Sequence, residues 1–153
     1  MSATIPNCVT IHPRAVDVIE REIASAPAGI ETGGILLGQR IGGEVEIRVA
    51  GEPGPKAIRQ RRYFLRDLDH AQQLAAAAWS EHRAQWVGEW HTHPNTGLAP
   101  SEFDLDTYRK HLCDDELGFD VFVSVIARST KTGTRLIAWA ITPASVERLS
   151  LRS

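Results

Sequence analysis

The sequence predicts a mixed α/β fold of the α+β kind, in which helices pack against a sheet. Three segments show apolar residues at helical spacing, and short apolar segments typical of strands lie between them. The predicted order is helix, two strands, a short strand, helix, strand, helix and two strands, which combines hairpins with helical crossovers. A length of 153 residues suits one core, so we expect residues 1–153 to form a single domain.

The first helix is predicted over Arg14 to Ala26, where Pro27 and Gly29 end the pattern. Strands are expected at 34–40 and 44–50, joined by a two-residue Gly-Gly turn that suits positive backbone dihedrals. The apolar positions of the helix recur three or four residues apart, as one face of an amphipathic helix requires: Val16, Ile19, Ile23 and Ala26.

Residues 51–62 are rich in proline, glycine and arginine and predict an exposed loop, followed by a short strand at Tyr63 to Leu65. The basic run at 59–62 could attract an acidic partner, but a solvated loop is the favoured interpretation. A second helix is expected from Asp67 to about Arg83. Its sheet-facing residues are predicted to be Leu68, Ala71, Ala75, Ala78 and Trp79.

The segment 85–93 is rich in aromatic and β-favouring residues and predicts a strand that ends at Pro94. A third helix opens at Ser101, with Leu105, Tyr108 and Leu112 on one face. The segments 119–127 and 134–141 predict a closing hairpin around a polar turn.

Composition and charge exclude several classes of protein. A net charge of -2 and a pI near 6.3 argue against nucleic-acid binding, which calls for a strongly basic face. The longest apolar runs are far shorter than the roughly 20 residues that cross a membrane. Cys8 and Cys113 are too few for a disulfide framework, and no signal pattern opens the chain, so we expect a cytoplasmic location.

A metal site is predicted where the 85–93 strand meets the third helix. His91 and His93 are two residues apart and therefore project from the same strand face. The intervening loop can bring Asp104 back to them, which gives two imidazoles and one carboxylate. Three such ligands leave one zinc position open, as in catalytic sites. The histidine pair alone could be explained by core packing, and Ser101 with Asp104 alone by helix capping. The two motifs together form a specific pattern.

A zinc hydrolase also needs a carboxylate that takes a proton from water. Glu31 is one candidate because it precedes a Gly-Gly pair, where backbone or substrate can approach closely. Glu89 is a rival, since it shares a strand face with both histidines and could instead orient an imidazole. A thiol nucleophile at Cys113 is disfavoured because the nearby His111 does not face it on a helix.

The motifs E-T-G-G-I-L-L-G at 31–38 and H-T-H-P followed by S-E-F-D at 91–104 resemble those of the JAMM (MPN+, JAB-type) metalloprotease family. The resemblance implies a JAB/MPN-like fold over nearly the whole chain. It implies one zinc ion bound by His91, His93 and Asp104, with Ser101 stabilising the oxyanion and Glu31 activating water. Two positions depart from the family pattern: Thr92 stands where serine is common, and Glu89 where an aromatic residue often occurs.

The resemblance further implies a peptidase or isopeptidase that cleaves at the C-terminal tail of a ubiquitin-like protein or its conjugates. The short chain is similar to compact prokaryotic members, including those encoded with ubiquitin-like conjugation machinery in antiviral operons, so activating and conjugating enzymes are expected associates. Two other functions remain open. One is removal of a small adduct from a sulfur-carrier protein, and the other is a non-catalytic scaffold that binds a ubiquitin-like partner.

Overall fold

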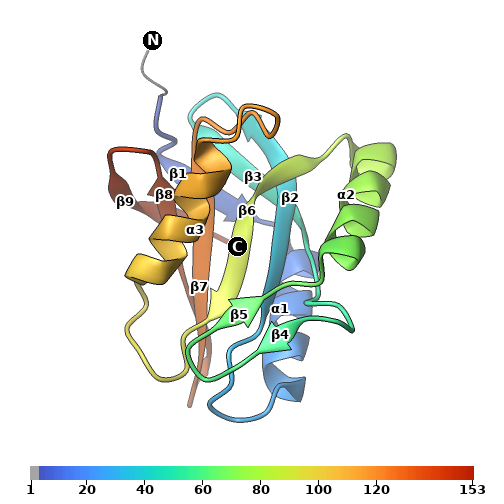
Figure 1. Cartoon of the computed structure of the whole chain (residues 1–153), viewed down its shortest axis with the longest axis vertical. Coiled ribbons are helices and arrows are strands. Elements are labelled where there is room, and N and C mark those ends of the chain that lie inside the picture. Colours follow the sequence, from blue (N-terminus) through green and yellow to red (C-terminus); the bar gives the residue numbers. More distant parts are fainter. Residues whose placement is uncertain (1–3) are drawn as a thin grey trace.

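A computed structural model describes residues 4–153 and contains a large mixed sheet with helices on both faces. Seven strands follow one another in the order β1-β3-β2-β6-β7-β8-β9, and parallel pairing of β1 with β9 closes the sheet into a barrel (Figure 1). The strands of this barrel are β1 Cys8–Ile11, β2 Gly33–Ile41, β3 Glu44–Ala50, β6 Gln85–Thr92, β7 Phe122–Thr130, β8 Gly133–Ile141 and β9 Val146–Arg152. A separate two-stranded sheet consists of β4 Ile58–Arg59 and β5 Phe64–Leu65.

The helices begin and end where local sequence signals place them. Helix α1 (Pro13–Ser25) starts at a proline, which fits the first helical turn because its missing N–H would be unpaired there. Helix α2 (Leu68–His82) is capped by Asp67 and ends at Arg83, whose φ of 55° is left-handed. Helix α3 (Glu102–Leu112) has Ser101 as its N-cap. None of these helices, within residues 4–153, has the length and apolarity needed to span a membrane.

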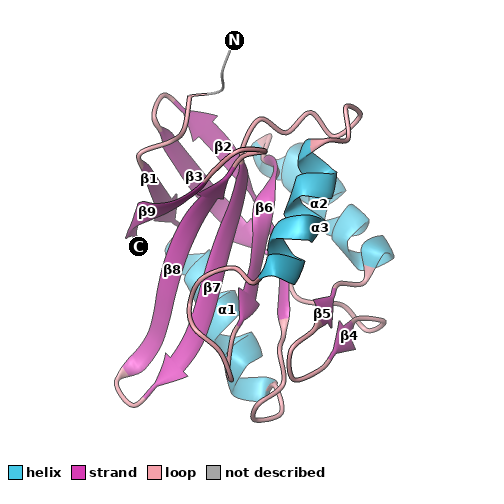
Figure 2. Ribbon diagram, turned by 60° about the vertical axis from the view of Figure 1, so that its left-hand side comes forward, coloured by secondary structure: helices cyan, strands magenta, loops and turns pink. Residues whose placement is uncertain are grey.

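The helices cover opposite faces of the sheet. Helix α1 packs through Ala15 and Ile19 onto the largest apolar cluster, which includes Leu36 of β2 and Trp90 of β6. On the other face, α2 packs against Ile35 and its neighbours, and α3 packs against β7 and β8 (Figure 2). Because strand side chains alternate between faces, Trp90 points toward the α1 side while Glu89 and His91 point toward α3. The histidine pair therefore lies on the α3 face.

The predicted mixed α+β fold is confirmed, as are the β2–β3 hairpin, the β6 strand and the β7–β8 hairpin. In the first turn only Gly42 has a positive φ, at 61°, which matches the sign pattern of a type II′ turn. Residues 51–62 are not all loop, because β4 lies within them. The strands β1 and β9 were not predicted, since each is short or strongly polar and is stabilised by pairing with a distant segment.

The predicted face of α2 is partly wrong. Ala71 and Ala78 are buried against the sheet, as expected, but Leu68 is 60% exposed and Trp79 is 47% exposed. Leu74 packs into the cluster instead. The helical period allows several overlapping stripes, and the narrow alanine-lined surface is the one that the sheet can approach closely. Strand β7 begins at Phe122, three residues later than predicted. Phe119 instead packs into an aromatic cluster just before the strand.

Gly88 generates a prediction about β6, the strand that carries the histidines. A Cβ atom at this position would overlap the carbonyl oxygen of Val123 in the neighbouring strand β7. Backbone atoms cannot move aside as a flexible side chain can. Gly88→Ala should therefore lower the free energy of unfolding by about 3 kcal/mol, measured by denaturant titration.

Gly97→Ala is the matched control, because a Cβ there meets nothing within 4 Å. Its free energy of unfolding should change by less than about 1 kcal/mol. Equal stability of the two variants would contradict the close β6–β7 approach.

Candidate metal centre

The end of β6 and the start of α3 bring three ligand atoms together. His91 Nε2 and His93 Nε2 lie 2.9 Å apart, and Asp104 Oδ2 is 3.2 Å and 3.1 Å from them respectively. Both histidines are only 2% exposed. Zinc bonds of about 2.0–2.1 Å separate tetrahedral ligand atoms by about 3.3 Å, so the three atoms have nearly the spacing that one such ion requires.

The tautomers of the two histidines direct lone pairs toward the same point. His93 Nδ1 lies 2.7 Å from the carbonyl oxygen of Gly97, which can only accept, so Nδ1 carries the proton. His91 Nδ1 lies 3.4 Å from Glu89 Oε1, which likewise favours a proton on Nδ1. In the neutral rings both Nε2 atoms are then acceptors, and they face each other and a carboxylate oxygen. Such an arrangement of three lone pairs fits a bound cation.

The electrostatics of the site also favour a positive charge. Burial alone lowers the pKa of His91, but hydrogen bonds and the charges of Asp104 and Glu89 more than offset this and raise it to about 10. Burial raises the pKa of the Asp104 carboxyl, yet its contacts with the two histidines dominate and bring it well below its ordinary value. The same negative surroundings that raise the pKa of His91 would also stabilise a divalent cation between these atoms.

Ser101 and Asp104 form a reciprocal capping box at the start of α3. The Asp104 backbone N–H donates to Ser101 Oγ at 3.1 Å, and the Ser101 backbone N–H donates to Asp104 Oδ2 at 2.8 Å. The same carboxylate oxygen therefore receives the cap hydrogen bond and faces both histidines. The sequence left helix capping and metal binding as alternative roles for Ser101 and Asp104. The observed positions of these side chains allow both roles at once.

Glu31 lies two residues before the start of β2 and is buried beside the histidines. Its Oε1 atom is 3.7 Å from His93 Nε2, and its backbone N–H donates to the carbonyl oxygen of Gln60 at 2.8 Å. Burial raises the pKa of the Glu31 carboxyl; the positive histidines oppose that rise and the other carboxylates reinforce it. Glu31, His91 and His93 offer ligand atoms within 4.8 Å of one another, so this carboxylate is close to any ion held there.

Glu89 contacts the opposite side of His91. Its Oε1 atom is 3.4 Å from His91 Nδ1, and its Oε2 atom accepts a hydrogen bond from Arg66 Nη1 at 2.9 Å. The carboxylate thus faces the nitrogen that points away from the three converging ligand atoms. This geometry suits orientation of the imidazole better than removal of a proton from water.

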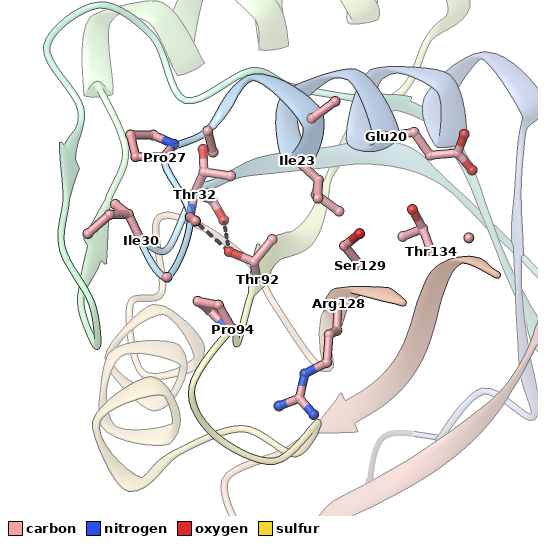
Figure 3. Close-up of a pocket in the computed structure, with 15 residues that line it drawn as sticks. Glu20, Ile23, Pro27, Ile30, Thr32, Thr92, Pro94, Arg128, Ser129 and Thr134 are labelled. Atoms are coloured by element: carbon pink, nitrogen blue, oxygen red, sulfur yellow. Dashed lines mark hydrogen bonds between the residues drawn. The ribbon is translucent and has the colours of Figure 1, made fainter. Parts of the chain in front are cut away.

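Thr92 points away from the histidines, toward α1. Its hydroxyl accepts from the Thr32 backbone N–H at 3.0 Å and lies 3.4 Å from the Thr32 carbonyl oxygen, as Figure 3 shows. These two threonines line a pocket of about 540 Å³ that also contacts Ile23 and Pro94 (Figure 3). Thr92 therefore links β6 to the residue that follows Glu31, on the reverse face of the strand.

Several residues around the histidines were not predicted from the sequence. The Tyr108 hydroxyl is 3.4 Å from His91 Nδ1 and accepts from Ser124 Oγ at 3.1 Å. Arg128 donates through Nε and Nη2 to the His93 carbonyl oxygen, at 3.1 and 2.9 Å. Tyr108 could have been found, because it lies four residues after Asp104 on the same helix face. Arg128 belongs to a distant strand, and nothing in the sequence connects it to the site.

Curated proteins from several bacteria are similar to part of this chain. A Vibrio cholerae protein named CD-NTase/cGAS isopeptidase is 34% identical over 88 residues, which is 56% of each chain. A protein of the same name from Pseudomonas aeruginosa is 29% identical over 97 residues, covering 62% of this chain and 61% of the relative. The chain thus matches little more than half of the length of these relatives.

Two solved structures share the fold. A protein from Desulfitobacterium hafniense has a TM-score of 0.66 at 18% identity, covering 94% of this chain and 90% of that one. A protein from Salinibacter ruber has a TM-score of 0.56 at 24% identity, covering 94% and 91%.

A family model described as prokaryotic homologs of the JAB domain matches residues 15–142, from α1 to the end of β8. That range contains both motifs on which the resemblance to JAB-type proteins was based. The resemblance is therefore confirmed, and the chain belongs to the family of prokaryotic homologs of the JAB domain.

Proposed function

We propose that this chain is a zinc-dependent isopeptidase, with the ion held by His91, His93 and Asp104. The observation that carries the proposal is the convergence of three lone pairs from these residues, with the buried carboxylate of Glu31 beside them. Two imidazoles and one carboxylate leave an open position, which is the pattern of catalytic rather than structural zinc. We further propose that residues 1–153 act as one domain.

The roles of the chain's own residues follow from their positions. A zinc ion bound there would lower the pKa of a water molecule and polarise the scissile carbonyl. Glu31 takes a proton as the water oxygen bonds to the carbonyl carbon, and gives it to the departing amine as the C–N bond breaks. Burial raises the pKa of the Glu31 carboxyl, which makes it a stronger base than an exposed glutamate. The Ser101 hydroxyl donates a hydrogen bond to the developing oxyanion.

The relatives support the choice of bond. They carry the name CD-NTase/cGAS isopeptidase, so an isopeptide bond is the proposed target in this chain as well. The proposed substrate is a ubiquitin-like protein joined through its C-terminal tail to an amine. A conjugate between such a tail and a lysine of a CD-NTase is the first substrate to test.

Asp104→Asn tests the metal centre. The amide retains the size of the side chain but replaces a charged ligand with a neutral one, so zinc affinity should fall about 10–100-fold. Competition with a chromophoric chelator measures this affinity. Asp106→Asn, on the exposed face of the same helix, is the control and should bind zinc like the wild type. Equal zinc affinity in both variants would remove Asp104 from the ligand set.

Glu31→Gln tests the base. The variant should retain one zinc ion per chain while kcat for the conjugate falls about 100- to 10,000-fold, because the amide cannot accept the proton. Zinc content and initial rates are measured on the same preparation. Exposed Glu52→Gln should retain the wild-type rate. If Glu31→Gln cleaves normally while Glu89→Gln binds zinc normally but does not cleave, the base is Glu89.

The identity of the leaving group is read from the products. Mass spectrometry of the ubiquitin-like protein before and after treatment should show release of the intact conjugated protein. Removal of only a small adduct would instead favour the sulfur-carrier function, and binding without release would favour a scaffold.

Ser101→Ala separates the oxyanion role from helix capping. Loss of the hydroxyl should lower kcat about 100- to 1,000-fold and the free energy of unfolding by about 1 kcal/mol. Ser101→Thr keeps a hydroxyl and should restore most of both quantities. A Ser101→Ala variant that loses stability but keeps the wild-type kcat would show that this serine only caps α3.

A further inference from the structure

We propose that Arg66 is a positioning residue that holds Glu89 against His91 and thereby fixes the direction of the His91 ligand atom. This inference rests on the proposed metal centre and adds a residue that no motif in the sequence indicates. Arg66 lies outside both motifs, in the short connection between β5 and α2.

The contacts of Arg66 show how it acts. Its Nη1 atom donates to Glu89 Oε2 at 2.9 Å, and the two side chains are only 12% and 9% exposed. The guanidinium carbon lies 4.9 Å from the ring centroid of Trp86, so a cation–π contact holds the planar group in place. The following residue, Asp67, is fixed through its backbone N–H to Pro53 and caps α2. Other contacts thus hold both the guanidinium of Arg66 and the backbone that follows it.

Arg66 leaves each oxygen of Glu89 with one partner. Oε2 is occupied by the guanidinium, and Oε1 faces His91 Nδ1 at 3.4 Å. A carboxylate that accepts a hydrogen bond from the His91 Nδ1–H keeps the Nε2 lone pair directed at the ion, as partners of metal-bound histidines commonly do. Because both oxygens are engaged, Glu89 is not free to turn toward the cation as a competing ligand.

Removal of the guanidinium would leave a buried carboxylate without its cation, which is unfavourable. The imidazole of His91 remains beside Glu89, with Nδ1 3.4 Å from Oε1 and Nε2 at the proposed ion position. Glu89 is then expected to shift toward this ring and the ion, which disturbs the orientation of the imidazole. The consequence is a weaker and differently coordinated metal site, even though Arg66 itself does not touch the metal ligands.

The test uses Co²⁺ as a spectroscopic probe bound to the full chain in place of zinc. Arg66→Met should lower the affinity for Co²⁺ about 10–100-fold and reduce the intensity of its visible bands, which report the coordination geometry. Arg66→Lys, which keeps the charge but not the planar fork, should give an intermediate affinity. Arg48→Met is the matched control, since Arg48 pairs with Glu46 at 3.4 Å on β3 and should leave both quantities unchanged.

A combined substitution tests whether Arg66 acts through Glu89. The double variant Arg66→Met with Glu89→Gln should bind Co²⁺ no more weakly than Glu89→Gln alone, because the carboxylate that Arg66 holds in place is already absent. Losses that multiply in the double variant would overturn the inference. If Arg66→Met does not fold, which circular dichroism reveals, Arg66→Lys decides: a wild-type affinity and spectrum in that variant would equally overturn it.

The outcomes separate this inference from the proposed function. Wild-type protein that binds no Co²⁺ or zinc would refute the metal centre and the role of Arg66 together. Wild-type protein that binds the ion, beside an Arg66→Met variant with the same affinity and the same bands, would refute only the role of Arg66. A fall in kcat at constant KM in Arg66→Met is expected, because a misdirected ligand impairs the reaction more than the capture of substrate.

Discussion

The convergence of two imidazole nitrogens and one carboxylate oxygen is the constraint around which the rest of the site is organised. His91, His93 and Asp104 contribute these atoms from two elements. Acceptors at such distances repel one another unless a positive charge lies between them. The fold must therefore hold them there against that repulsion, and it does so with backbone hydrogen bonds to Gly97 and Ser101 and with the pairing of β6 in the sheet.

Three carboxyl groups surround this point, buried Glu31 and Glu89 and half-buried Asp104, and their different partners separate their proposed roles. Asp104 faces both histidines, which suits ligation. Glu89 is engaged by Arg66, which suits orientation of His91. Glu31 makes a longer approach to His93 and is strongly affected by burial, which suits transfer of a proton. Residues of the same chemical type thus obtain distinct properties from the cations and dipoles nearest to them.

The segment from β4 to the start of α2 contacts several parts of the site at once. Gln60 accepts the backbone N–H of Glu31, and the Arg61 carbonyl accepts from the Asn95 side chain. Tyr63 packs against Phe103 at the start of α3, with ring centroids 5.3 Å apart, and Arg66 reaches Glu89. A change in the position of this small sheet would therefore reach Glu31, Glu89 and the helix that carries Asp104.

The sequence by itself determined the local parts: the three helices to within a residue or two, the hairpins, and the strand and helix start that carry the histidines and Asp104. Periods of two and 3.6 residues and the H-x-H spacing are local, so they can be read along the chain. Closure of the barrel by β1 and β9, the exposed Leu68 and the contacts of Arg66 were decided only by the tertiary structure. These features depend on pairing and charge neutralisation between distant segments, which no local pattern encodes.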